Sequence, residues 1–175
     1  ETIKAVQEHS LNDVIWPVFS KIKLENSDLM CIEYETIEYK KEYKLSDNEA
    51  ISAIQTDHTV PSCGYIYERN GSSVLITADT FKIDNIVERL NNEKSIKALV
   101  LECSFLSEME ELAIASKHLT PRLIAKYLEG LRRDDLRLYI NHIKPLYLEE
   151  ITKELEQYCS KWKPKVVKDG EIVNF

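Results

Sequence analysis

Three residues that could bind a metal ion each follow an apolar run that is typical of a β-strand. They are His58, Asp79 and His142. Imidazole and carboxylate groups at strand ends are the ligands that zinc or manganese takes in hydrolases. One edge of a sheet can gather residues that are far apart in sequence, so these three side chains could meet at one site. A metal ion there would lower the pKa of bound water to about 7, which provides a nucleophile at neutral pH.

Other groups in the sequence could complete such a site. The two oxygens of Asp79 could serve two cations at once and bridge them. His118 precedes the predicted start of a helix at Thr120-Pro121, and an imidazole with a pKa near 6.5 is suited to protonating a leaving oxygen. The free N–H groups at that helix start could hold a phosphate.

Residue types alone leave simpler interpretations open. A histidine at a strand end is more often a surface or hydrogen-bonded residue than a metal ligand. His118 could serve as a capping or packing residue, and Asp79 could be the N-cap of the helix that follows it. His9 and Cys103 are interpreted as structural residues.

Size and composition indicate a water-soluble domain. At 175 residues the chain is one domain or part of one, and we expect residues 1–175 to form a single, partial domain. Hydrophobic residues make up 43% and charged residues 30% of the chain, which is enough for a core. No apolar run could span a bilayer, and residues 1–10 show no signal peptide. A membrane partner is therefore not expected.

Charge and cysteine usage restrict the partners and the compartment. The formal net charge is −7, which disfavours nucleic acid as a partner, because nucleic acid binding depends on phosphate neutralisation by Lys and Arg. A short basic run, Lys161, Lys163, Lys165 and Lys168, is interpreted as a solvated face of the tail. The cysteines show no CxxC spacing, so we expect them to be reduced and packed in a cytoplasmic protein.

The order of elements predicts an α+β fold. Residues 29–45 alternate in polarity like exposed antiparallel strands, and Asn70-Gly71 is typical of a tight hairpin turn. Strand–helix alternation follows, which favours a sheet packed between helices. We predict helices over 1–13, 81–92, 121–130 and 146–159, and further strands over 51–56, 64–68, 73–77, 98–101 and 136–140.

Six short motifs resemble one family of hydrolases in the order in which that family carries them. The chain is similar to metallo-β-lactamase-fold hydrolases, and most closely to class II cyclic-nucleotide phosphodiesterases. In this family glycine usually precedes the bridging aspartate, whereas this chain has Ala78. The motifs are Asn12 to Pro17, His58 to Tyr65, Asp79-Thr80, Leu101 to Phe105, Ser116 to Pro121 and Tyr139 to Pro145.

The resemblance implies a role for each matching residue. It implies that His58 and His142 are terminal ligands of two metal ions, zinc or manganese, and that Asp79 bridges them. It implies that His118 protonates the leaving oxygen of a 3′,5′-cyclic nucleotide such as cyclic AMP. The predicted substrate-binding residues are Lys144, Thr120 and Ser104. The implied fold is the second half of an αββα sandwich.

The family's His-x-His-x-Asp-His motif is missing from this sequence. We therefore expect a C-terminal half of a longer protein that supplies only part of the metal site, with zinc bound weakly or not at all by this chain alone. Two alternatives remain, a transfer-RNA 3′-processing endonuclease and a degenerate, non-catalytic interaction domain. An isolated half-sheet would expose strand edges, which favours a homodimer.

Overall fold

All residues from 1 to 175 are described by the computed structural model of the protein. Residue contacts divide them into two compact units, residues 1–38 and residues 39–175, and each unit is described by itself. The expected single domain over 1–175 stays a prediction. No helix in the chain combines the length and the apolar character that crossing a membrane requires.

The first unit contains one α-helix, α1 (Thr2–His9), which is shorter than the predicted helix over 1–13, and a short 3-10 helix over Phe19–Lys21. The Asn12 side chain explains where the helix stops. Its amide oxygen accepts hydrogen bonds from the backbone N–H groups of Val14 and Ile15, both at 3.0 Å. Asparagine that bonds the backbone two residues on forms a turn that competes with a helix. None of the residues of α1 is buried.

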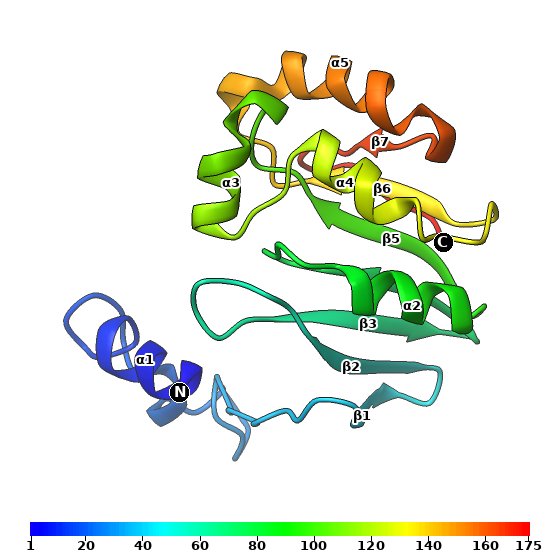
Figure 1. Cartoon of the computed structure of the whole chain (residues 1–175). Coiled ribbons are helices and arrows are strands. Elements are labelled where there is room, and N and C mark those ends of the chain that lie inside the picture. The colour runs from blue at the N-terminus through cyan, green and yellow to red at the C-terminus, as the bar shows by residue number, and fades with distance from the viewer. The chain divides into compact units, whose positions relative to one another are not determined.

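The second unit is a mixed sheet with helices (Figure 1). Its strands and helices alternate after β4, as the sequence predicted. The elements are β1 (Glu42–Ser46), β2 (Glu49–Gln55), β3 (Cys63–Arg69), β4 (Ser72–Ile76), α2 (Asp84–Asn92), β5 (Ile96–Glu102), α3 (Glu110–Ser116), α4 (Pro121–Leu128), β6 (Arg137–Asn141), α5 (Leu148–Cys159) and β7 (Lys165–Val166).

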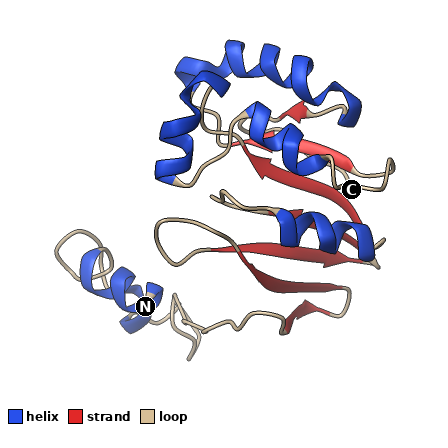
Figure 2. Ribbon diagram, viewed as in Figure 1, coloured by secondary structure: helices blue, strands red, loops and turns tan.

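The seven strands lie in the sheet in the same order as in the sequence, β1 to β7 (Figure 2). Neighbours from β1 to β4 pair antiparallel, and neighbours from β4 to β7 pair parallel. Helix crossovers connect the parallel strands, as such connections require. The predicted α+β order, with antiparallel strands first, is confirmed.

The tight turn between β3 and β4 follows from its two residues. Asn70 and Gly71 have φ values of 52° and 78°, and a two-residue hairpin turn of this kind needs positive φ at both positions. The two strands on either side of the turn pair in register, with Glu68 opposite Ser73. The predicted hairpin is therefore confirmed, and its second strand leads the chain toward Asp79.

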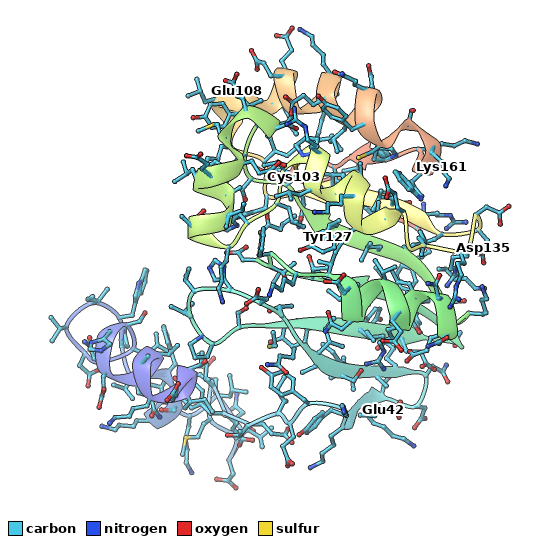
Figure 3. All side chains as sticks on the ribbon, viewed as in Figure 1. Glu42, Cys103, Glu108, Tyr127, Asp135 and Lys161 are labelled. Atoms are coloured by element: carbon cyan, nitrogen blue, oxygen red, sulfur yellow. The ribbon has the colours of Figure 1, made fainter.

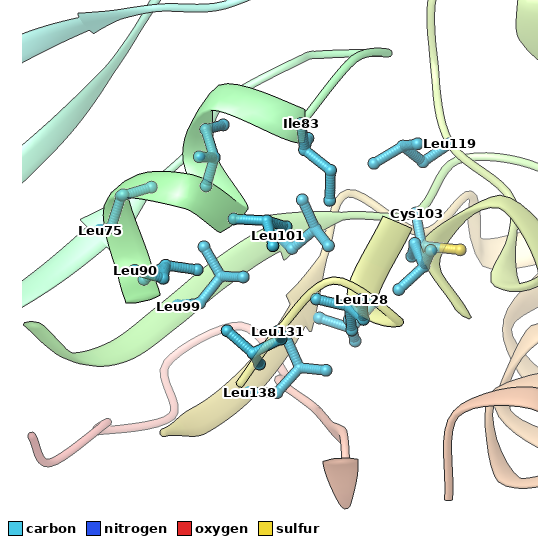
Figure 4. Packing of buried hydrophobic residues seen from close by; sticks show 14 of the residues in the cluster. Leu75, Ile83, Leu90, Leu99, Leu101, Cys103, Leu119, Leu128, Leu131 and Leu138 are labelled. Carbon is cyan, nitrogen blue, oxygen red and sulfur yellow. The ribbon is translucent and has the colours of Figure 1, made fainter. Parts of the chain in front are cut away.

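The core lies between the parallel strands and the helices α2, α4 and α5 (Figure 4). Leu75, Leu99 and Leu101 of β4 and β5 are fully buried, as are Leu90 of α2 and Leu128 of α4. Each of these helices packs one apolar face against the sheet, which is the expected pattern for surface helices. All four cysteines are free thiols, and Cys103 and Cys159 are completely buried.

The prediction of exposed strands over residues 29–45 is wrong for most of that range. Only Glu42–Ser46 forms a strand, β1, which pairs with Glu49 to Ser52 of β2. Met30 and Tyr39 form isolated bridges and no strand. Polarity alternation cannot tell whether a partner strand exists. Two short elements had no sequence signal that we used, α3 and the two-residue strand β7.

Candidate metal centre

The sheet topology brings the predicted ligands to one edge. Strands β4, β5 and β6 run parallel, so their carboxyl ends lie at the same edge. Strand β2 runs in the same direction, because it is antiparallel to β3 and β3 is antiparallel to β4. His58 follows β2, Asp79 follows β4 and His142 directly follows β6. The ends of three strands, β2, β4 and β6, therefore supply the predicted ligands.

Asp79 lies between two imidazoles. Nε2 of His58 is 3.8 Å from Oδ2 of Asp79, and Nε2 of His142 is 3.4 Å from Oδ1 of the same carboxylate. Each oxygen thus faces a different histidine, which is the arrangement a bridging carboxylate needs. The structure brings these three predicted residues together, while their roles as ligands stay predictions.

A backbone carbonyl fixes the tautomer of His58. Nδ1 of His58 lies 3.3 Å from the carbonyl oxygen of Lys117. A carbonyl only accepts hydrogen bonds, so Nδ1 carries the proton and Nε2 keeps its lone pair toward Asp79. Metal-binding histidines are oriented by the same type of contact. Nζ of Lys117 also donates to Oδ1 of Asp57 at 2.6 Å and to the carbonyl of His58 at 3.3 Å.

His118 lies between the other two histidines and is held by a buried carboxylate. Its ring centroid is 5.0 Å from that of His58 and 5.6 Å from that of His142. Nδ1 of His118 is 2.6 Å from Oε1 of Glu102. Because an ionised carboxylate can only accept hydrogen bonds, Nδ1 carries a proton. Nε2 then remains free to bind a metal ion or to transfer a proton. Glu102 thereby plays the orienting part that a carboxylate plays behind catalytic or metal-bound histidines.

Glu102 is the last residue of β5 and has no exposed surface. Its carboxylate accepts from the backbone N–H groups of Thr80 at 3.0 Å and Leu119 at 3.2 Å, and from the hydroxyl of Ser104 at 3.0 Å. Burial raises the pKa of Glu102, and the Thr80 N–H and the charge of His118 offset part of this rise. A carboxylate that is this deeply buried needs such hydrogen-bond partners in order to remain ionised.

The three predicted substrate-binding residues have different surroundings. Ser104 is fully buried, and its hydroxyl is used by Glu102 and lies 3.2 Å from Nδ1 of His118. Thr120 is also fully buried and caps α4 by accepting from the N–H of Leu123. Lys144 is exposed, with Nζ 3.9 Å from the ring centroid of Phe105. Contact with a substrate is geometrically open to Lys144, and all three substrate roles stay predictions.

The donor set fits a divalent metal ion such as zinc. His58, Asp79 and His118 each offer a donor atom, and these atoms lie within 4.8 Å of one another. Two imidazole nitrogens and a carboxylate oxygen are zinc-type ligands, and the two imidazoles are already held by Lys117 and Glu102. This geometric group shares two members with the predicted set and contains His118 where the sequence predicted His142.

Three residues around the site hold left-handed backbone conformations. Ala78, Lys117 and His142 have φ values of 52°, 56° and 58°. Such values are uncommon outside glycine and gather at functional sites. The value at Ala78 also explains why glycine suits the position before the predicted bridging aspartate, since glycine adopts positive φ without strain.

Sequence reasoning missed the two residues that orient the histidines. Glu102 and Lys117 both lie within the motifs of the sequence analysis, but the sequence assigns neither of them a role. A glutamate at the end of a wholly apolar strand is itself a signal, because Glu is almost never fully buried unless it is paired. No local pattern marks Lys117, since its carbonyl reaches His58 through tertiary structure.

Comparisons with known proteins identify the fold. No protein-family model matches the sequence, and no curated protein matches it. Among solved structures the chain is similar to unliganded yeast PDE1, with a TM-score of 0.74 and 17% identity over 96% of this chain and 56% of that one.

Two further solved structures agree. The Bacillus subtilis metallo-β-lactamase fold protein YhfI gives a TM-score of 0.66 and 14% identity over 92% of this chain and 61% of that one. The short form of human tRNase Z gives 0.53 and 17%, over 76% and 45%. The mixed sheet with helices is thus a metallo-β-lactamase fold, and the chain spans about half to three-fifths of the length of these proteins.

Proposed function

We propose that this chain supplies part of the metal site of a hydrolase that cleaves the phosphodiester of a 3′,5′-cyclic nucleotide. One observation carries the proposal. The carboxylate of Asp79 stands between the Nε2 atoms of His58 and His142, at 3.8 and 3.4 Å. The metallo-β-lactamase fold and the motif resemblance to class II cyclic-nucleotide phosphodiesterases support it.

His58, Asp79 and His142 would hold the metal ions, zinc or manganese, with His118 within reach of the same group. A divalent ion bound there supplies Lewis-acid charge and a nucleophile at neutral pH. His58 is prepared for this task because its Nδ1 proton is engaged by Lys117. Further ligands from residues outside this chain would complete the site in the whole protein.

His118 would protonate the departing ribose oxygen. Its Nδ1 is bound to Glu102, so a proton on Nε2 makes the ring an imidazolium whose charge lies beside a carboxylate. Release of the Nε2 proton to the departing oxygen returns the ring to neutral. The side chain of His118 is only 15% exposed, which keeps the donor away from bulk water.

Lys144 would attract the phosphate. Its ammonium lies over the ring of Phe105, and this ring lies 5.8 Å from that of His118. The cation is therefore held near the proton donor, where a phosphodiester anion would sit. A small cyclic nucleotide suits this single cation better than a transfer-RNA precursor does, because a polynucleotide needs many cations and the chain carries a net charge of −7.

The experiment compares histidine variants of the complete protein with cyclic AMP and with a bis-nitrophenyl phosphate. His118→Ala should keep its metal and lose roughly 10²- to 10⁴-fold in kcat with cyclic AMP, the range of general acid catalysis. The loss should shrink with the nitrophenyl ester, whose leaving group needs no proton. His142→Ala should lose metal and both activities, and His9→Ala, in the first unit, should change neither.

Other results would change the assignment. Loss of metal in His118→Ala would make His118 a ligand, as its place in the donor group allows. Absence of hydrolysis by a fully metal-loaded protein would refute the enzyme and favour the non-catalytic interaction domain. The expected cytoplasmic location and homodimer stay proposals, to be tested by fractionation and by light scattering.

A further inference from the structure

A cavity lies away from the metal centre, around the start of β6. Its volume is about 380 Å³, and Leu128, Leu131 and Leu138 of the core are among its lining residues. Ligand sites usually measure about 300–1,000 Å³ with mainly apolar walls and a few polar groups. The cavity thus has the size and the apolar wall of a site for a small organic molecule.

Positive charge gathers around this cavity. Its lining holds Arg133, Arg137, Lys161, Lys163 and Lys165 against a single acidic residue, Asp134. The chain as a whole carries a net charge of −7, so this concentration opposes the average charge of the protein. Three of these lysines form the basic run that the sequence showed and that the proposed hydrolase does not use.

Not all of these cations are free. Arg133 is held by both oxygens of Asp135, at 2.8 and 2.9 Å, and Lys165 is paired with Glu171. Lys161 and Lys163 form no ion pair, and Lys161 lies with Nζ 5.2 Å from the ring centroid of Trp162. Two lysines are therefore available to an incoming anion, next to an aromatic ring.

Trp162 supplies a donor without a partner. Its indole Nε1 is buried and makes no hydrogen bond in the protein, and the residue lines the cavity. Buried polar groups are nearly always paired, so an orphaned N–H needs an explanation. Because the Nε1 atom is buried, the indole must turn before an oxygen of a bound ligand can accept from it. The indole face would then stack on a planar ring.

We propose that this cavity binds a small anion with a planar aromatic ring, the chemistry of a nucleoside monophosphate. The ring packs by Trp162 and the leucine wall, and the phosphate contacts Lys161 and Lys163. Charge complementarity selects the phosphate, and the orphaned indole N–H selects a ligand with an oxygen acceptor. The inference goes beyond the proposed hydrolase and does not depend on it.

The cavity and the metal centre lie at opposite ends of β6. Arg137, Leu138 and Tyr139 at the start of the strand line the cavity, and His142 follows its end. At about 3.3 Å per residue, the backbone of Arg137 is roughly 16 Å from that of His142. In Figure 3, Asp135 and Lys161, which lie near the cavity, are labelled on the same side of the molecule. Cys103 follows the carboxyl end of β5, which is the end at the metal centre. One ligand cannot fill both sites.

Adenosine 5′-monophosphate is the probe, and tryptophan fluorescence is the first readout. The chain has only two tryptophans, so Trp16→Phe leaves Trp162 as the sole reporter. The titration is performed with a chelator present and repeated in Asp79→Ala, which separates this cavity from the metal centre. We expect a saturable fluorescence change with the nucleotide, and at least about 10-fold weaker binding of adenosine or inorganic phosphate alone, since each lacks one recognised part.

Calorimetry with charge variants is the second readout. Neutralising both free lysines, as Lys161→Gln with Lys163→Gln, should raise Kd at least about 10-fold, because charge-assisted hydrogen bonds are lost. Lys168→Gln is the matched control, since Lys168 belongs to the same basic run but does not line the cavity. It should leave Kd within about 2-fold, as a screened distant charge does.

Three results would overturn the proposal. The first is no saturable signal by fluorescence and no heat by calorimetry. The second is equal weakening by Lys168→Gln and by the double variant. The third is loss of binding in Asp79→Ala, which would place the nucleotide at the metal centre. None of these binding results measures hydrolysis, so the proposed function is tested separately by the activity of the histidine variants.

Discussion

The buried carboxylate of Glu102 gives the sharpest mutational test of the site. Oε1 accepts from the N–H of Thr80 and faces Nδ1 of His118, and Oε2 accepts from the hydroxyl of Ser104 and the N–H of Leu119. The hydroxyl can rotate and the imidazole can change tautomer, but the two backbone donors cannot reverse. Each carboxylate oxygen therefore faces one donor that requires an acceptor.

Glu102→Gln keeps the shape and cannot satisfy both backbone donors. Whichever way the amide is turned, its NH₂ group meets the N–H of Thr80 or of Leu119. A buried donor left without an acceptor costs about 1–3 kcal/mol. A loss of 2 kcal/mol would lower Tm by about 4–8 °C in a protein of this size. The variant should also loosen the hold on His118, because a neutral amide oxygen accepts from the imidazole N–H more weakly than a carboxylate does.

Glu154→Gln is the matched control. Glu154 binds the N–H of Ser107 at 2.8 Å and its hydroxyl at 2.7 Å, but both reach the same oxygen, Oε2. The amide oxygen of glutamine can replace that oxygen, so the change in unfolding free energy should stay below about 0.5–1.5 kcal/mol, the net value of one hydrogen bond. The assay is urea unfolding of both variants, and the slopes of unfolding free energy against urea concentration (the m values) are compared to check that both unfold in the same way. Equal stability of Glu102→Gln and the wild type, or equal losses in both variants, would refute the hydrogen-bond account.

Three further predictions concern backbone and thiols. Gly64→Ala should destabilise the protein by about 1–3 kcal/mol in urea unfolding, because a Cβ would lie 2.6 Å from a backbone oxygen of β4; unchanged stability would contradict this close packing. Ala78→Gly should stabilise the protein by up to about 1 kcal/mol, because glycine removes the strain of the left-handed backbone and this gain exceeds the entropic cost of ordering glycine. A clear loss of stability would count against that backbone conformation. Disulfide exchange with an aromatic reagent at neutral pH should modify the exposed Cys31 quickly and spare Cys103 and Cys159 until unfolding, because burial raises the pKa of Cys103 well above its usual value and that of Cys159 to about 12. Rapid reaction of all thiols in the native state would show that these two are not packed in the core.

Gly130→Ala serves as the control for the glycine substitution. A Cβ there would meet a side-chain carbon of Val87 at 3.4 Å and no closer atom. This is an ordinary contact with a group that can adjust, and the position has no positive φ. The variant should therefore be at least as stable as the wild type.

The sequence was informative where local chemistry marks structure. Apolar runs ending in a polar residue located β2, β4, β5 and β6, and the parallel ends of such strands bring His58, Asp79 and His142 together without further information. The turn at Asn70-Gly71 and the cap at Thr120 were likewise local, since each depends on one or two residues whose backbone preferences are strong.

Tertiary structure decided the remainder. Nothing in the sequence near Ser104 and Thr120 shows that both hydroxyls are fully buried and used inside the protein. The orientation of His118 depends on Glu102, and that of His58 on Lys117, through contacts across the fold. The alternating pattern of residues 29–41 predicted strand that does not form, because pairing needs a partner that periodicity cannot reveal.

A calorimetric titration of the wild type and of Asp79→Ala with zinc tests the central claim most directly. With the carboxylate of Asp79 3.8 Å from Nε2 of His58 and 3.4 Å from Nε2 of His142, we expect weak, saturable zinc binding by the wild type. Removing the carboxylate between the histidines should abolish the heat, whereas His9→Ala should keep it. Zinc binding that survives Asp79→Ala unchanged would contradict a metal centre at this sheet edge.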